Sequence, residues 1–154
     1  MSKKNDLQKV TRAYKDATGE REIDMHKVAE WAVTTLGWTL PKPVKPIDLL
    51  AKQLADAARE EIRHDKTTGL PYRVNHAIVQ KMGRGQTHLW IDIDEAPREQ
   101  MHASLINRRE QMVGDGLQIT LDAGHWNSIH PTEDPIKIPM DFTFDIELRK
   151  NVPD

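Results

Sequence analysis

Residues 72–93, YRVNHAIVQKMGRGQTHLWIDI, hold two runs of alternating side chains around a turn that contains two glycines. Glycine reaches the positive φ angles that tight hairpin turns require. The stretch therefore predicts a β-hairpin, with strands at 72–82 and 87–93 and a turn at 83–86. A turn between two strands does not lead into a helix N-terminus, so its glycines are not expected to form a phosphate-binding loop.

Alternation along the two strands sorts their side chains onto two faces. One face is expected to be buried in the core, and it carries Val74, His76, Ile78, Gln80, Leu89, Ile91 and Ile93. The other face is polar, as in a binding surface or a contact with a second element, and it carries Arg73, Asn75, Ala77, Val79, Lys81, His88, Trp90, Asp92 and Asp94. Asp92 and Asp94 are expected to be more exposed than Leu89, Ile91 and Ile93 on the first face.

Helical patterns precede the hairpin. A short basic helix is expected at 6–17, and apolar residues recur at helical spacing in 22–36, where Gly37 supplies a stop. The same spacing in 47–64 predicts a further helix, with Pro46 suited to its first turn.

A long helix is expected to follow the hairpin. It opens at Pro97 and extends to Leu117 or Leu121. Gly114 and Gly116 each cost about 1 kcal/mol relative to alanine inside a helix. We therefore expect the helix to break there, or another backbone to pack closely against it.

These elements predict the α+β class, with N-terminal helices, a central β-hairpin in winged-helix-like order, a long helix and an extended C-terminal arm. Pro41, Pro43 and Pro46 favour an extended strut. The expected organisation is one compact domain overall with four segments: an N-terminal helical unit at 1–40, the strut at 41–46, a helix-hairpin-helix core at 47–123, and an extended acidic arm at 124–154.

Composition sets further limits. The chain has 154 residues, 38% of them hydrophobic and 30% charged, which is sufficient for one core. Because it has no cysteine, disulfides, thiolate zinc sites, iron–sulfur clusters and cysteine nucleophiles are excluded. No stretch approaches the ~20 apolar residues of a membrane span. We expect a cytoplasmic protein with no membrane partner and no cofactor.

Charge is distributed unevenly along the chain. Basic residues exceed acidic ones in 1–21, and acidic residues exceed basic ones in 133–154. This asymmetry suggests nucleic-acid contact by the basic end or head-to-tail pairing of chains, although two solvated termini would look the same.

The order of helices and hairpin resembles a winged-helix reader of DNA, in which a helix enters the major groove and the hairpin tip touches phosphate. Helix 47–64 and the hairpin would then contact nucleic acid through Lys52, Arg59, Arg63, Arg73, Lys81 and Arg84. The pI of about 6.4 and the interleaved acidic residues argue against this hypothesis. Another basic pair, Arg108 and Arg109, lies near Glu110 and Asp115, so ordinary pairs within the helix are favoured there.

Two clusters have residue types that bind metals. His88, Asp92 and Asp94 share a strand face, although acidic residues just before Pro97 are also typical of a helix entry. Asp122, His125 and His130 lie in a segment expected to be irregular, where Trp126 and a histidine more often seal a loop onto the core.

The functional hypotheses are ranked accordingly. First comes a small bacterial-type regulatory protein, a homodimer that binds nucleic acid, duplex DNA in particular, through helix 47–64, the hairpin tip and the basic N-terminal arm. Second comes a non-enzymatic module for protein–protein interaction or self-assembly. Third comes a metal-dependent hydrolase that uses His88, Asp92 and Asp94.

Overall fold

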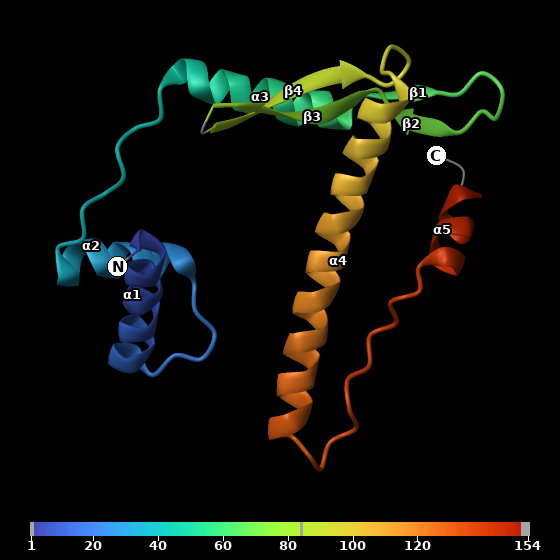
Figure 1. Ribbon diagram of the computed structural model, residues 1–154. Helices are drawn as coiled ribbons and strands as arrows, with labels where there is room; N and C mark the ends of the chain where they lie inside the picture. Colours follow the sequence, from blue (N-terminus) through green and yellow to red (C-terminus); the bar gives the residue numbers. More distant parts are fainter. Residues whose placement is uncertain (1, 84, 152–154) are drawn as a thin grey trace. The chain divides into compact units, whose positions relative to one another are not determined.

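The computed structural model describes residues 2–83 and 85–151, and it divides the chain into two compact units, Met1–Leu49 and Leu50–Asp154. Figure 1 shows helices together with antiparallel hairpins, which confirms the α+β class. Within the described residues no helix combines the length and the apolar character that crossing a membrane demands.

The first unit is a pair of capped helices, α1 (Lys3–Thr18) and α2 (Met25–Leu36). Ser2 and Asp24 cap their N-termini through side-chain oxygens that accept backbone N–H groups. Gly37 ends α2 with a φ of 64°, a left-handed conformation that favours glycine, so the predicted stop is confirmed.

The core of this unit is small. Val10 and Tyr14 of α1 pack against Val28 and Ala32 of α2, and Trp31 meets the Tyr14 ring edge-on at 5.6 Å between centroids. The Tyr14 hydroxyl donates to Glu20 at 2.9 Å. A two-helix unit buries little apolar surface, so its stability depends on these few contacts.

Helix α3 spans Pro46–Glu60, with Pro46 in the first turn as predicted. The predicted end at residue 64 is wrong, because Ile62–His64 forms strand β1 and pairs antiparallel with β2 (Pro71–Arg73). The turn between these strands is stabilised by Asp65, whose carboxylate accepts the N–H groups of Thr67 and Thr68. These local bonds replace the helical hydrogen bonds that a longer α3 would make.

The predicted hairpin forms from β3 (Asn75–Met82) and β4 (Gly85–Asp92), but residues 72 and 73 belong to β2 and not to its first strand, and β4 begins at Gly85, inside the expected turn. The register opposes His76 to Ile91, Ile78 to Leu89 and Ala77 to Trp90, so the predicted faces are confirmed. The predicted burial is confirmed only in part. Val74 and His76 are buried, but Leu89 is 49% exposed and Asp92 is half-buried, so the expectation that Asp92 is the more exposed of these two is wrong.

Helix α4 (Arg98–Ile129) packs on β3, where the buried hydroxyl of Ser104 donates to the carbonyl of Ala77 at 2.8 Å. The helix does not break at its glycines and extends beyond the predicted end at 117 or 121. Gly116 faces the C-terminal segment, since a Cβ built there would lie 3.7 Å from the sulfur of Met140. This is ordinary contact with a side chain and not close packing of another backbone, and nothing lies within 4 Å of a Cβ built at Gly114, so neither expected outcome applies at the glycines.

The C-terminal segment runs back along α4 (Figure 1). Asn127 holds it by two bonds to the backbone of Ile136, at 2.9 and 2.8 Å. The extended arm expected from residue 124 begins only after Ile129, and Thr143–Lys150 forms helix α5 instead of remaining extended. Prolines 131, 135 and 139 account for the irregular stretch between the helices, because each removes a backbone donor.

The burial of Val74 gives a stability test. Val74 is 2% exposed, so Val74→Ala should lower the free energy of unfolding by about 1–3 kcal/mol through lost apolar contact and a residual cavity. Val79→Ala is the matched control, since Val79 is 39% exposed on the same hairpin and should cost clearly less. Chemical denaturation followed by tryptophan fluorescence measures both variants. An equal loss in the two variants would contradict the assignment of Val74 to the core.

Candidate functional site

Arg63 joins the two hairpins of the second unit. It lies on β1, and its guanidinium donates to the Asp92 carboxylate at 2.7 Å and to the Asp94 carboxylate at 2.9 Å. Asp94 also accepts the Tyr72 hydroxyl at 3.0 Å, and Asp92 accepts the Asp94 backbone N–H at 2.9 Å. This Arg63 cluster therefore links β1 and β2 to the end of β4.

The cluster shifts the acidity of its members. The hydrogen bond from Arg63, followed by that from the Asp94 backbone, holds the pKa of Asp92 below its ordinary value of 3.8. The bond to Asp92 is also the main reason why the pKa of Arg63 is raised. The pKa of Tyr72 is raised, first by burial and then by its bond to Asp94. The shifts of Asp92 and Arg63 favour their ion-paired forms, and the shift of Tyr72 keeps its hydroxyl protonated as a donor to Asp94.

These contacts bear on the proposed metal chemistry of His88, Asp92 and Asp94. Both carboxylates already bind Arg63, and among the described residues there is no group of three potential ligands that could hold a metal ion. The predicted helix-entry role of Asp94 is also wrong, because Pro97 is the N-cap of α4 and no side chain caps it. Asp94 serves the Arg63 cluster instead.

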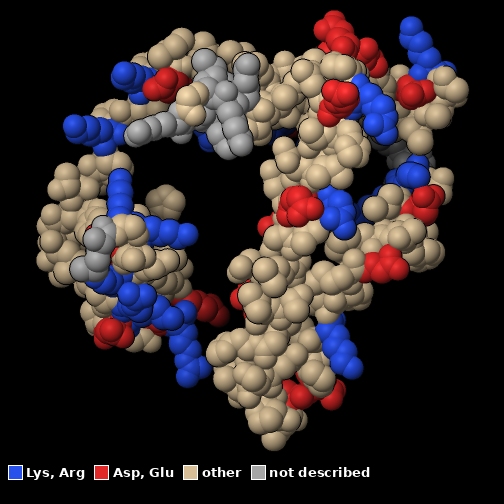
Figure 2. Space-filling view, viewed as in Figure 1, with Lys and Arg blue, Asp and Glu red and all other residues tan. Residues whose placement is uncertain are grey.

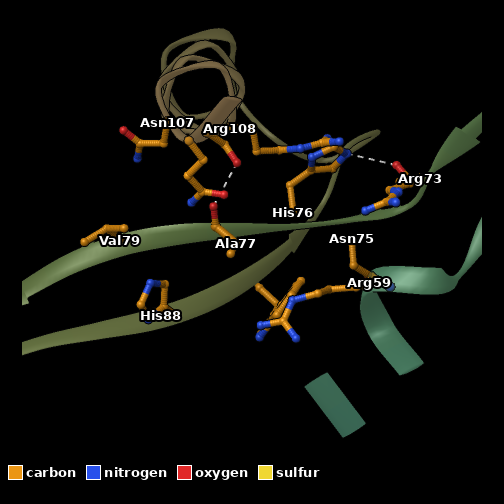
Figure 3. Close-up of a pocket in the computed structure, with 12 residues that line it drawn as sticks. Arg59, Arg73, Asn75, His76, Ala77, Val79, His88, Asn107 and Arg108 are labelled. Atoms are coloured by element: carbon orange, nitrogen blue, oxygen red, sulfur yellow. Dashed lines mark hydrogen bonds between the residues drawn. The ribbon is translucent and has the colours of Figure 1, made fainter. Parts of the chain in front are cut away.

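A second feature is a pocket of about 290 Å³ along strand β3. Arg59 of α3, Arg73 of β2 and Arg108 of α4 contribute its positive charges, and His76, Trp90 and Asn107 also line it. Figure 3 shows Arg108 and His76 on the α4 side of the strands and Arg59 on the other side. We call this the arginine pocket.

The three arginines differ in their partners. Arg59 pairs with Asp56 at 2.7 Å and lies 5.3 Å from the ring centroid of Trp90. Neither Arg73 nor Arg108 has a side-chain ion pair or hydrogen bond within the described part of the chain. No carboxylate is among the described residues that line the pocket. The pocket is therefore a place of excess positive charge in a protein whose net charge is −2.

Packing fixes part of the pocket. His76 is 5% exposed, and its Nε2 lies 2.9 Å from the Arg73 carbonyl oxygen. Because a carbonyl only accepts, Nε2 carries the proton. The Asn75 amide donates to the Ala58 carbonyl and to Glu61, which joins β3 to the end of α3. These bonds hold the arginine-bearing elements together.

The six basic residues predicted to contact nucleic acid have different environments. Arg59 and Arg73 meet at the arginine pocket, whereas Arg63 is held by Asp92 and Asp94. Lys52 is exposed on α3 and does not line this pocket. The side chain of Lys81 and the whole of Arg84 lie outside the described residues.

Sequence reasoning missed Arg108 as a pocket residue. The favoured interpretation was a pair within the helix, and Arg109 does bind Glu110 at 3.3 Å, but Arg108 turns to the pocket instead. Its position four residues after Ser104 places both side chains on one helix face. The sequence alone does not show that this face lies toward β3, because that inference requires the burial of Ser104.

The second histidine cluster has a structural role. Residues 124–129 are helical and not irregular as expected, and the rings of Trp126 and His130 stack at 4.1 Å between centroids. The His130 ring also contacts the Trp126 carbonyl oxygen at 2.9 Å. This stack closes the C-terminal end of α4.

A third feature is the exposed apolar surface of α4. Ser104 is the only buried residue in the helix, although apolar residues occur on all its sides. Residues 111–129 include only two charged residues, Asp115 and Asp122. In Figure 2 this part of α4 is correspondingly tan. Shallow pockets between α4 and the C-terminal segment are lined by Met112, Val113, Met140 and Phe142.

Comparison with family models, with curated proteins and with solved structures finds no match to this chain.

The Arg63 cluster predicts a specific pH dependence. Because the pKa of Asp92 is lowered in the folded state, its ionised carboxylate stabilises the fold at pH values above the ordinary pKa of an aspartate. This contribution is lost as the pH falls below about 4. Arg63→Ala should lower the urea midpoint at pH 7, and it should show a smaller further decrease between pH 6 and pH 3 than the native protein. Urea unfolding at several pH values measures both effects.

Arg98→Ala is the control for this test, because it removes the same charge from an exposed position on α4 that has no contact with the cluster. It should retain the native pH dependence. If Arg63→Ala and Arg98→Ala behave alike, the cluster does not link the two hairpins energetically.

Proposed function

We propose that this cytoplasmic protein is a non-enzymatic self-assembly module in which α4 and the C-terminal segment pack against a second copy of the chain. The observation that carries the proposal is the accessible surface of 13558 Å². Two separate globular domains of the same sizes, 49 and 105 residues, would together expose roughly 9,500 Å². This reference value treats the two units as fully separated.

Much of the excess apolar surface lies on α4. Leu105, Met112, Leu117 and Leu121 are each between 46% and 56% exposed. A helix that is apolar on all sides belongs in the interior of a larger structure, because water does not cover such a surface favourably. The described part of this chain supplies only the C-terminal segment, which lies along one side of the helix.

The spacing on α4 favours another long helix as the partner. Leu105, Met112, Ile119 and Trp126 recur every seven residues, the repeat that keeps one side of a helix facing another over many turns. Helix α4 has 32 residues and is about 48 Å long, so a covering helix must have similar length. A second α4 has that length, and two identical surfaces form a closed two-fold dimer.

Self-assembly has a direct test. The native protein should have a mass in solution of at least twice its chain mass of 17.7 kDa. Leu105→Asn together with Ile119→Asn should shift it to the monomer, because a dimer formed through the repeat would then bury amides without partners. Sedimentation equilibrium measures the mass. Leu40→Asn is the control, since Leu40 is 67% exposed outside α4 and the substitution should leave the mass unchanged. A monomeric native protein at tens of micromolar would overturn the proposal.

Nucleic-acid binding is the second candidate function. The observation that favours it is that Arg59 and Arg73, two of the six predicted contacts, lie at the same pocket as Arg108. The basic residues of α1 add further positive charge, seen as blue side chains in Figure 2. Against this candidate, Arg63 is neutralised by two carboxylates.

Salt dependence tests this candidate. If duplex DNA binds through the arginine pocket, the binding constant should fall steeply with salt, because each phosphate contact releases condensed counterions. Arg73→Ala should then reduce the log–log slope by about 0.9. The double substitution Lys3→Ala and Lys4→Ala tests the basic N-terminal arm, because it leaves the core residues Val10 and Tyr14 unchanged. Fluorescence anisotropy of a labelled duplex measures the slopes. No binding at low salt would dismiss the candidate.

A further inference from the structure

We propose that the arginine pocket is a binding site for a phosphate group. The proposal is independent of self-assembly, and it gives a ligand chemistry to the surface that the nucleic-acid candidate would use. It rests on the geometry of one pocket, on the free guanidinium groups that line it, and on the lack of carboxylates among its described lining residues.

The donors match a phosphate in kind. Guanidinium groups present planar pairs of N–H donors that fit phosphate oxygens, and they stay charged at any physiological pH. Arg73 and Arg108 come from β2 and α4, so their charges approach the pocket from different elements. Asn107 precedes Arg108 on α4 and adds an amide that can donate to an oxygen.

Two guanidinium groups are available for a ligand. Arg73 and Arg108 lack side-chain partners within the described residues, whereas Arg59 is shared between Asp56 and the face of Trp90. Arg73 and Arg108 are like charges without a counter-charge among the described lining residues, so an anion that enters the pocket relieves the repulsion between them. Arg59 then contributes at longer range and supports the pocket wall.

The walls of the pocket are held in place before any ligand enters. The Ser104 hydroxyl fixes α4 to Ala77, and the Asn75 amide fixes the end of α3 to β3. Buried His76 binds the carbonyl of Arg73 and so fixes the backbone that carries this arginine. Such pre-formed walls reduce the ordering that binding requires.

The size of the pocket limits the ligand. A volume of about 290 Å³ lies at the lower end of the range for small-molecule pockets. This volume suits one hydrated phosphate ion, or the phosphate group of one nucleotide in a nucleic-acid chain. Free phosphate and a phosphate in a nucleic-acid chain share this chemistry, so the experiment must separate the two sources.

Calorimetric titration of the full chain with inorganic phosphate, and separately with a short single-stranded oligodeoxynucleotide, tests the proposal. Arg73→Ala and Arg108→Ala should each weaken phosphate binding about tenfold or more, as expected for the loss of a charged hydrogen bond. Arg98→Ala is the matched control, because it removes the same charge from α4 outside the pocket and should leave binding unchanged. Far-ultraviolet circular dichroism checks that each variant folds.

The outcomes separate the two sources. Phosphate binding that depends on Arg73 and Arg108, without oligonucleotide binding, supports the pocket and counts against the nucleic-acid candidate. Competition between phosphate and oligonucleotide for the protein supports both the phosphate site and the nucleic-acid candidate. The proposal is overturned if neither ligand binds, or if Arg98→Ala weakens binding as much as the two pocket variants do.

Discussion

The bridge from Arg63 to Asp92 and Asp94 connects parts of the chain that are about thirty residues apart in sequence. Each hairpin alone has only two strands, and an isolated two-stranded hairpin is marginally stable in water. Arg63 joins the pair of short strands to the end of the longer hairpin, directly before α4 begins. The placement of α4, and with it one wall of the arginine pocket, depends on this junction.

A second constraint is the small number of buried residues. Within the described residues only seven are buried, and they are divided between the two units: Val10, Tyr14, Val28, Ala32, Val74, His76 and Ser104. Polar bonds such as those of Ser104 and Asn75 therefore hold elements that a larger core would hold by packing. A chain with so few buried residues gains stability when its exposed apolar surfaces bind a partner. A second copy of the chain is always present at the same concentration.

The arginine pocket and the surface of α4 have different chemical character, although both involve the same helix. The N-terminal half of α4 faces β3 and carries Arg108 to the pocket, whereas the half after Gln111 is almost uncharged. Ligand binding and assembly can therefore coexist on one helix. Because α4 is continuous through Gly114 and Gly116, the two regions belong to one rigid element.

The sequence by itself determined several of the local elements. Alternation and paired glycines predicted the β3–β4 hairpin and its two faces, and Gly37 and Pro46 marked a helix end and a helix start correctly. Such features follow from the φ and ψ preferences of neighbouring residues, which are encoded locally. The glycines in α4 were less informative, because their local cost of about 1 kcal/mol each is small beside the hydrogen bonds of a long helix.

Only the tertiary structure decided which charges are free. Arg63, Arg73 and Arg108 look alike in the sequence, yet Arg63 is held by two carboxylates while the other two reach a pocket without acidic lining in its described part. The difference arises from contacts between residues far apart in the chain, and no local preference encodes such contacts. Pairing of β1 with β2 ended α3 earlier than its helical pattern indicated and placed Arg63 beside Asp92. The physical reason is that a charge acts on whatever lies within a few ångströms of it in space, and only the fold sets those neighbours.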